Sequence, residues 1–131
     1  MAKTAAELNL PAELKYTDEH IWVRVEGEEL VVGVSDYAQD QLGEVVYVDL
    51  PSEGDSFDAA AEFGEVESIK SVNKLFMPVA GEVVAVNGEL DGTPTLLNSS
   101  CYGDGWIIRV KPENMADLEG LLSADAYRAI L

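Results

Sequence analysis

The chain has few of the residues on which catalytic and metal sites depend. Its 131 residues include one cysteine, Cys101, and one histidine, His20. A single cysteine forms no internal disulfide, and the sequence contains no clustered Cys/His set with the spacing of metal ligands. A lone histidine and a lone cysteine also supply no complete pair of nucleophile and base. The sequence therefore favours a metal-free protein that is not an enzyme.

Long apolar runs and a basic leader are missing too. No stretch approaches the roughly 18 continuous apolar residues of a membrane span. The N-terminus MAKTAAELNL has no basic segment followed by an apolar one. Only 5 prolines and a hydrophobic content of 47% fit one compact domain rather than a disordered chain. We therefore expect a cytoplasmic protein with no membrane partner.

Positive charge is scarce. The chain has 8 Lys and Arg residues against 25 Asp and Glu residues, a formal net charge of −17, and the acids are scattered along its length. Such a surface repels nucleic acid and anionic membranes, so neither is an expected partner. Solubility explains the charge more simply than steering toward basic partners does. The scarcity also makes each lysine informative, and the five are Lys3, Lys15, Lys70, Lys74 and Lys111.

The two ends of the chain favour helices. Residues 1–14 contain Ala-rich, helix-capable sequence and predict a short helix or arm, so the main domain is expected at 15–131. After Pro112 the spacing becomes helical, with a leucine face over residues 118–122 and a cap for a second segment at Ser123. We therefore expect the chain to end in helices packed on a β core.

Between these ends the sequence has the pattern of short strands. Residues 21–34 form two apolar runs around a polar turn and predict a β-hairpin. A short helix is expected next, because Ser35 can cap it and Gly43 can end it. Further strands are expected at 63–69, at 75–79 and at 106–110.

One hexapeptide occurs twice in closely similar form. Residues 43–48 are GEVVYV and residues 81–86 are GEVVAV, so the copies share five of six residues. Each copy is a β-branched strand pattern followed by a polar turn. GEVV strings are common in β proteins, so the repeat alone favours a duplicated sandwich only modestly. Together with the strands between the copies, it predicts two related β units packed face to face.

Lys70 falls at a bend between two of the predicted strands. Residues 70–73 join those strands, which places Lys70 at or beside a hairpin tip. A lysine at such a tip is most often only a solvated charge. Here its context is more specific, because ESIKS occupies residues 67–71 and PVAGEVV occupies residues 78–84. The tip is therefore the first candidate for a functional site.

These strings around Lys70 resemble the lipoylation hairpin of glycine cleavage system H proteins. The resemblance covers about residues 15–125, and a match so long and dispersed is more specific than any local motif. Its other parts are KY at 15–16, His20 with WV at 22–23, GVSDYAQD at 33–40, LGEVVYVDLP at 42–51, NSS at 98–100 and GW at 105–106. The resemblance implies a mainly β barrel-sandwich hybrid: two small antiparallel sheets with a lipoyl hairpin, short helices and a helical C-terminus.

The resemblance also assigns roles at the tip. It implies lipoate joined by an amide to the ε-nitrogen of Lys70, with Glu67 and Ser71 in the recognition context of a lipoate ligase or lipoyl transferase. An exposed lysine on a rigid turn suits an enzyme that must select one lysine among five. Biotin fits less well, because biotinyl hairpins flank their lysine with methionines and this chain has Ile69 and Ser71. The protein would then be a carrier, with the lipoyl dithiolane as its reactive group.

The family resemblance further implies a cleft that holds the loaded arm, and the sequence departs from the family pattern there. The family places Glu directly after the histidine, whereas Ile21 follows His20 in this chain. The family commonly has an acid four residues after the lipoyl lysine, whereas this chain has Lys74. Both departures remove negative charge from the expected place of a cationic load, where a charge-assisted contact contributes about 1.5–3 kcal/mol.

The two departures lead us to prefer a role in sulfur-compound oxidation, as the lipoate-binding protein of a heterodisulfide-reductase-like complex. The alternative is a glycine cleavage H protein that takes the aminomethyl group from glycine decarboxylase, because H proteins can vary at these sites without changing role. Dihydrolipoamide dehydrogenase is a further expected partner. An unmodified interaction protein is a third hypothesis, and the intact ESIK string argues against it.

The single histidine and the single cysteine have structural explanations as well. Packing beside Trp22 with a structural hydrogen bond is the simpler expectation for His20, although its place at the expected cleft leaves a role on the arm open. Free cysteines are commonly inert small hydrophobic residues, so a redox role for Cys101 is the less favoured alternative. Trp106 is expected to belong to the core.

Overall fold

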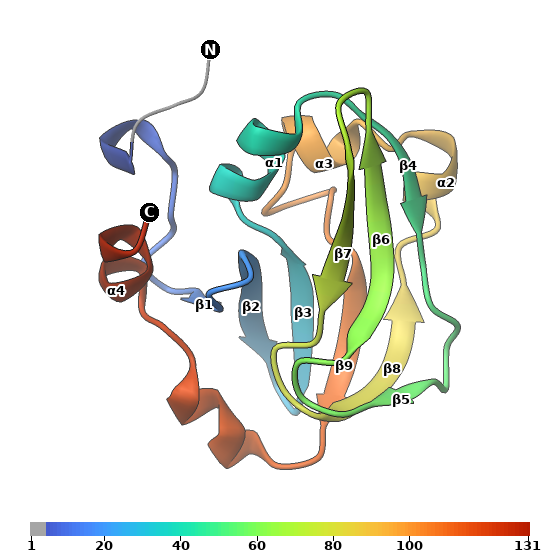
Figure 1. The fold of residues 1–131 in the computed structure, drawn as a ribbon. Coiled ribbons are helices and arrows are strands. Elements are labelled where there is room, and N and C mark those ends of the chain that lie inside the picture. Colours follow the sequence, from blue (N-terminus) through green and yellow to red (C-terminus); the bar gives the residue numbers. More distant parts are fainter. Residues whose placement is uncertain (1–4) are drawn as a thin grey trace.

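The computed structural model describes residues 5–131. These residues form two antiparallel sheets that face each other, with short helices gathered near one end and the C-terminal segment running along one side (Figure 1). The predicted mainly β fold with two antiparallel sheets is confirmed. Within the described part of the chain, no helix has the length and apolar character that crossing a membrane requires.

The larger sheet has six strands in the order β1-β2-β3-β9-β8-β5, and the smaller has the order β4-β6-β7. The larger sheet comprises β1 (Lys15–Tyr16), β2 (Ile21–Glu26), β3 (Glu29–Val34), β5 (Ser56–Phe57), β8 (Gly81–Val86) and β9 (Ile108–Pro112). The smaller sheet comprises β4 (Val45–Asp49), β6 (Glu62–Ser68) and β7 (Val72–Phe76). The α-helices are α1 (Asp36–Leu42), α2 (Glu89–Gly92), α3 (Leu96–Ser99) and α4 (Ala124–Ala129), and 3-10 helices occur at Ala5–Glu7 and Met115–Gly120.

The main core lies between the two sheets. Val32 and Ile108 from the larger sheet belong to the same buried cluster as Val48 and Val66 from the smaller sheet, and each is at most 1% exposed. Burying such a side chain contributes roughly 1.5–3 kcal/mol to the free energy of folding. The sheets are therefore held together by apolar side chains, and this leaves the hairpin β6–β7 with one packed face and one open face.

A second apolar cluster joins the two ends of the chain. Leu8, Leu10 and Leu14 pack in it with Tyr16 and Tyr127, whose rings stack at 4.8 Å between centroids. The expected N-terminal helix is reduced to the 3-10 turn at Ala5–Glu7, and the first four residues of that prediction lie outside the described residues. The three leucines anchor the segment that follows the turn to the rest of the molecule.

The first hairpin and the first helix follow the sequence prediction. Gly27 has a φ of 66° in the turn between β2 and β3. Ser35 caps α1 by accepting the Ala38 backbone N–H at 3.2 Å, and Gly43 ends the helix with a φ of 73°. A side chain strains the backbone at positive φ, so glycine is suited to both ends.

Other boundaries differ from the prediction. Strand β7 begins at Val72, three residues before the predicted start, because Ser68 closes the preceding turn at residue 71. Strand β9 covers Ile108–Pro112, so its prediction was two residues early. The helical expectation for 118–122 fails after Gly120, because Leu122 forms a bridge with β1 before α4 begins. The sequence analysis missed β1, β5, α2 and α3, which have only two to four residues each.

The two hexapeptide copies form strands in opposite sheets, β4 in the smaller and β8 in the larger. Each contains a β-bulge at the same point. The register shifts between Val45 and Tyr47 opposite β6, and between Val83 and Ala85 opposite β9. The prediction of two related β units in facing sheets is therefore confirmed.

Candidate functional site

Lys70 lies in the tight turn between β6 and β7. The Ser68 backbone N–H donates to the Ser71 carbonyl at 2.8 Å, and Ser68 Oγ accepts the backbone N–H groups of Lys70 at 3.1 Å and Ser71 at 3.2 Å. The Ile69 N–H donates to the Glu44 carbonyl at 3.1 Å. Ser68 is buried whereas Lys70 is exposed. A fixed turn thus presents one free lysine side chain at the tip.

Helix α1 ends beside this tip at Gly43. A Cβ on Gly43 would lie 3.3 Å from Lys70 Cε and 3.7 Å from Lys70 Nζ, so glycine leaves room for the lysine stem. Asn98 of α3 fixes the same stretch of backbone. Its Nδ2 donates to the Gly43 carbonyl at 2.6 Å, and its Oδ1 accepts the Val45 N–H at 2.9 Å. In the sequence, Asn98 is notable only as part of the NSS string of the family resemblance, so its clamping role is a finding of the structure.

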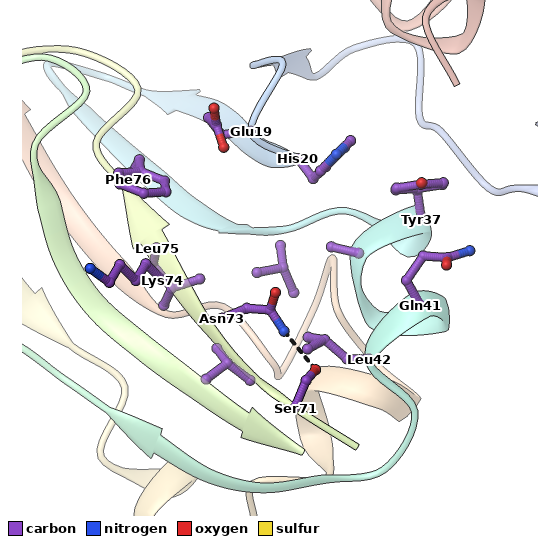
Figure 2. Close-up of a pocket in the computed structure, with 13 residues that line it drawn as sticks. Glu19, His20, Tyr37, Gln41, Leu42, Ser71, Asn73, Lys74, Leu75 and Phe76 are labelled. Carbon is purple, nitrogen blue, oxygen red and sulfur yellow. Dashed lines mark hydrogen bonds between the residues drawn. The ribbon is translucent and has the colours of Figure 1, made fainter. Parts of the chain in front are cut away.

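A cleft of about 290 Å³ lies between β7 and helix α1, close to the tip (Figure 2). Ser71 lies at one end of the β7 wall and Phe76 at the other. At about 3.4 Å per strand residue, that wall is about 17 Å long. Its apolar lining consists of Val34, Ala38, Leu42, Val66, Leu75 and Phe76, and its other lining residues are Glu19, His20, Tyr37, Gln41, Ser71, Asn73 and Lys74.

Two of the three residues predicted for the arm cleft line it, namely His20 and Lys74. Ile21 does not. It is the first residue of β2, pairs with Val34 of β3 and is 1% exposed within the main core. Strand alternation sends its side chain between the sheets, so the prediction for Ile21 was wrong. In this chain the Ile21 side chain is therefore part of the main core and not of the cleft lining.

Lys74 lines the cleft but directs its charge elsewhere. Its Nζ lies 3.5 Å from Glu62 Oε1 on the neighbouring strand. In Figure 2 the amine points away from His20 and Tyr37. Both partners are exposed, so the ion pair adds little stability, but it keeps a carboxylate beside the ammonium group. The positive charge that the sequence analysis placed in the cleft is therefore partly balanced at its edge.

Glu19 is a cleft residue that the sequence analysis missed. Among the residues that the structure describes, it is the one carboxylate in the lining of the cleft, and it lies next to His20 across from β7 (Figure 2). The signal available in the sequence was the position of Glu19 directly before His20. Glu19 is exposed, so its attraction for a cation is modest and depends on salt. Tyr37, Gln41 and Asn73 were missed as well.

His20 packs against two tyrosines rather than beside Trp22. The His20 ring centroid lies 4.6 Å from that of Tyr37 and 5.7 Å from that of Tyr127. Its Nδ1 lies 2.7 Å from the Tyr127 hydroxyl. Burial lowers the pKa of the imidazole, although acidic neighbours act in the opposite direction. The expected structural hydrogen bond of His20 is therefore present. Trp22 takes no part in that bond, because its Nε1–H donates to the Cys101 carbonyl at 2.9 Å.

The other predicted site residues divide into two groups. Ser71 lies in the tip, where its Oγ accepts a hydrogen bond from Asn73 Nδ2 at 2.9 Å, and Glu67 is exposed on β6 just before the tip. Cys101, the single cysteine of the sequence, is 7% exposed and lies outside the cleft lining. Among residues 5–131, no group of His, Cys, Asp and Glu side chains is arranged to hold a metal ion.

Two facing antiparallel sheets, with an exposed lysine on a fixed hairpin tip beside a narrow cleft, define the class of carriers that hold a cofactor on a lysine arm. The glycine cleavage H-protein family matches residues 14–131. The chain belongs to this family, whose members carry lipoate covalently on a lysine. The resemblance seen in the sequence and the lipoyl cofactor that it implied are thereby confirmed.

Individual relatives agree with the family match. The glycine cleavage system H protein of Bacteroides fragilis is 49% identical over 95% of this chain and 98% of its own length. That of Halalkalibacterium halodurans is 48% identical over 94% of this chain and 96% of its own length. The crystal structure of a glycine cleavage system H protein from Mycobacterium marinum is similar with a TM-score of 0.84 and 32% identity, covering 92% of this chain and 97% of that one.

The residues around Lys70 fit a lipoyl group. The amine is exposed, and Gly43 lacks the Cβ that would crowd the lysine stem. Leu42, Val66 and Leu75 give the adjoining cleft an apolar lining that suits a hydrocarbon chain. An exposed amine, space at Gly43 and an apolar lining nearby are the features that an acylated lysine requires at this position.

Proposed function

We propose that Lys70 carries the lipoyl group and that the protein is the carrier of the glycine cleavage system, holding the aminomethyl group received from glycine decarboxylase. The observation that carries this proposal is the place of Lys70, exposed on a fixed tip and beside a cleft whose lining contains the carboxylate of Glu19. The family membership supports the same function, since the relatives described above are glycine cleavage system H proteins.

The comparisons do not support the sulfur-oxidation role that the sequence analysis preferred, and the glycine cleavage alternative fits them better. The structure also weakens the two reasons for that preference. Ile21 is buried in the core, and Lys74 lies next to Glu62 rather than pointing into the cleft. A cationic load is therefore compatible with this cleft, because its remaining charged wall residue is Glu19.

Each part of the site has a definable task in this proposal. When bound, the lipoyl group supplies the thiol–disulfide chemistry. The Ser68 turn holds the attachment point still, and the apolar lining shields the arm from water. Glu19 attracts an ammonium group near the Phe76 end of the cleft, while the side-chain amides of Gln41 and Asn73 offer hydrogen bonds nearer to Ser71 (Figure 2).

A carrier also needs surfaces that its enzymes can recognise. Glu67 lies opposite Tyr47 on β4 and Val72 on β7, so the three side chains form one row across the exposed face near Lys70. This row, with Ser71 in the tip, is the proposed recognition context for the lipoate ligase or lipoyl transferase. Glycine decarboxylase and dihydrolipoamide dehydrogenase are the further proposed partners, and tethering raises the local concentration of the arm at each of them.

The attachment is tested by intact mass and peptide mapping after lipoylation with a lipoate ligase. The Lys70→Arg protein should gain no lipoyl mass, because the guanidinium is not acylated under these conditions. Lys74→Arg is the matched control, since it changes the other lysine of the same hairpin, and it should be modified fully. An adduct on any other lysine, or one retained in the Lys70→Arg protein, would overturn the attachment.

The cargo is tested by glycine-dependent carbon dioxide exchange with the pyridoxal-phosphate glycine decarboxylase. The lipoylated protein should support exchange, and the Glu19→Gln variant should need about twofold to fivefold more carrier at low salt, as expected for one exposed charge. Asp18→Asn is the control, because Asp18 is also exposed but lies outside this cleft lining. Absence of exchange with a fully lipoylated protein would exclude the glycine cleavage role.

A further inference from the structure

A chain of hydrogen bonds connects the cleft histidine with the cap of helix α1 by way of the C-terminal helix. His20 Nδ1 lies 2.7 Å from the Tyr127 hydroxyl, which lies 2.8 Å from Ser35 Oγ. Ser35 Oγ in turn accepts the Ala38 backbone N–H at 3.2 Å. Tyr127 and Ser35 are both 0% exposed, so solvent does not reach the middle of this chain.

The proton count of the chain selects one direction for its hydrogen bonds. Each hydroxyl has a single proton to donate. If Tyr127 donated to Ser35, the serine oxygen would accept two bonds and its own proton would have no acceptor among the described residues. If Ser35 donates to Tyr127, the tyrosine proton is free to go to His20 Nδ1, and both hydroxyl protons are paired. Buried donors are rarely left unpaired, so the second direction is favoured.

We infer that Tyr127 and Ser35 are positioning residues that hold His20 as the neutral tautomer with an unprotonated Nδ1 and a proton on Nε2. The cleft then meets its occupant with an N–H donor from His20. It offers no basic ring nitrogen, because Nδ1 is already occupied by the Tyr127 hydroxyl. The cleft and the C-terminal helix are thereby parts of one site.

The surroundings restrict the ring to this arrangement. The His20 backbone N–H donates to the Thr17 carbonyl at 3.1 Å, and the His20 carbonyl accepts the Ser35 N–H at 3.0 Å. Tyr16 stacks on Tyr127 with an interplanar angle of 1°, which fixes the ring that carries the donating hydroxyl. Burial lowers the pKa of His20 and favours the same neutral form.

The consequence for the site rests on the proposed function. An ammonium group has only donors, so its partner in the lining is Glu19 and not the Nε2–H of His20. The N–H on Nε2 suits an acceptor atom on the arm instead. The positioning residues therefore keep His20 as a hydrogen-bond donor toward the arm, while the charge preference of the cleft comes from Glu19.

The tautomer is measured by long-range proton–nitrogen NMR on the unmodified, ¹⁵N-labelled and tag-free protein. The chain contains one histidine, so the two ring nitrogens are assigned without ambiguity. The wild-type spectrum should show the tautomer with the proton on Nε2. The Tyr127→Phe variant, which loses the donor, should show a mixture of both tautomers. Tyr16→Phe is the matched control, because its buried hydroxyl donates to the Pro11 carbonyl instead, and its spectrum should be unchanged.

Protonation on Nδ1 in the wild type would overturn the inference, and this outcome does not depend on the stability of any variant. An unchanged tautomer in a folded Tyr127→Phe protein would also overturn it.

The role in the cleft is tested separately, by the rate at which the loaded, lipoylated protein loses its aminomethyl group. Tyr127→Phe should speed this loss about twofold to fivefold, as expected for one weakened hydrogen bond, and Tyr16→Phe should not. A failure of lipoylation itself would count against the proposed function and leave the NMR result to decide the tautomer.

Discussion

The two GEVV strings, at residues 43–46 and 81–84, lead into strands β4 and β8 and differ in what surrounds their glycine. Both contain a buried valine followed by a bulge, at Val45 in β4 and at Val83 in β8. Strand β4 lies at the edge of the smaller sheet, whereas β8 lies inside the larger sheet between β9 and β5. The local sequence is therefore sufficient to account for the strand and its bulge. The position of each strand in its sheet determines which neighbours its leading glycine packs against.

The two leading glycines show this division most clearly. Gly81 lies against the backbone of β9, where an added Cβ would be 2.6 Å from the Lys111 carbonyl oxygen. Gly43 lies in a turn with a φ of 73°, and a Cβ added there would lie nearest to the stem of Lys70, 3.3 Å from its Cε. One glycine permits the packing of two strands, and the other makes space at the functional tip. Substitutions at these positions should therefore separate stability from modification.

The largest effect is expected for Gly81→Ala. Its Cβ would meet backbone oxygen and Val110 Cγ1 at 2.7 Å, and an interior strand has little freedom to move. We expect the free energy of unfolding to fall by about 3 kcal/mol or more. Urea denaturation measures the loss, with Gly88→Ala as control, because nothing lies within 4 Å of a Cβ at Gly88. Equal midpoints for the two variants would contradict the packing role of Gly81.

A smaller loss of stability, with a second effect on the tip, is expected for Gly43→Ala. Its backbone, at φ 73° and ψ −156°, belongs to a region that is essentially restricted to glycine, so strain should cost about 2–3 kcal/mol. The new Cβ would also press on Lys70 Cε and slow lipoylation several-fold. Gly27→Ala is the control, since Gly27 has a φ of 66° and open space around its Cβ position. It should lose stability and keep the wild-type lipoylation rate.

The Lys70 tip shows how far the sequence alone could predict this site. The ESIK string and the strands around it were sufficient to place Lys70 at a hairpin tip, because they are local patterns. The wall of the cleft was not predictable in the same way, since Glu19 and Asn73 come from segments that only the tertiary fold brings together. Ile21 was misplaced for a different reason, because its side chain follows the local alternation of β2 into the core and does not accompany its neighbour His20.

The fold shows the same limit. The hairpin β2–β3 and the cap at Ser35 were predictable because their signals lie within a few residues of one another. The short pairing of Tyr16 with Trp22 and the bridge from Tyr16 to Leu122 were not, because two-residue contacts leave no periodic pattern. The hydrogen-bond chain from His20 to Ser35 also joins residues that are far apart along the sequence, through Tyr127.

The next-largest loss of stability is expected at Asn98, which holds the edge strand β4 in place. Asn98 binds the Gly43 carbonyl and the Val45 N–H, which have no strand beyond them, whereas the corresponding part of β8 pairs with β9. Asn98→Ala should lower the free energy of unfolding by about 1–2 kcal/mol, because water can replace part of the lost bonding at an edge. Hydrogen exchange at the Val45 amide should become faster. Ser99→Ala, which removes one exposed side-chain bond, is the control and should leave that amide protected.

The smallest effect is expected where the two copies differ in sequence. Tyr47→Ala converts the first hexapeptide into GEVVAV, the sequence of the second. Tyr47 is 54% exposed and lies opposite Glu67, so the loss should stay below about 1 kcal/mol, the range of a cross-strand pair. Val25→Ala, at another exposed strand position, is the control for lost β propensity. The NMR chemical shifts of the backbone amides around Val46 report on the bulge. If Tyr47→Ala leaves them unchanged, GEVV and its neighbours are sufficient to form the bulge. A loss of several kcal/mol would instead mean that Tyr47 holds the edge strand in place, and the two copies would then differ in more than their surroundings.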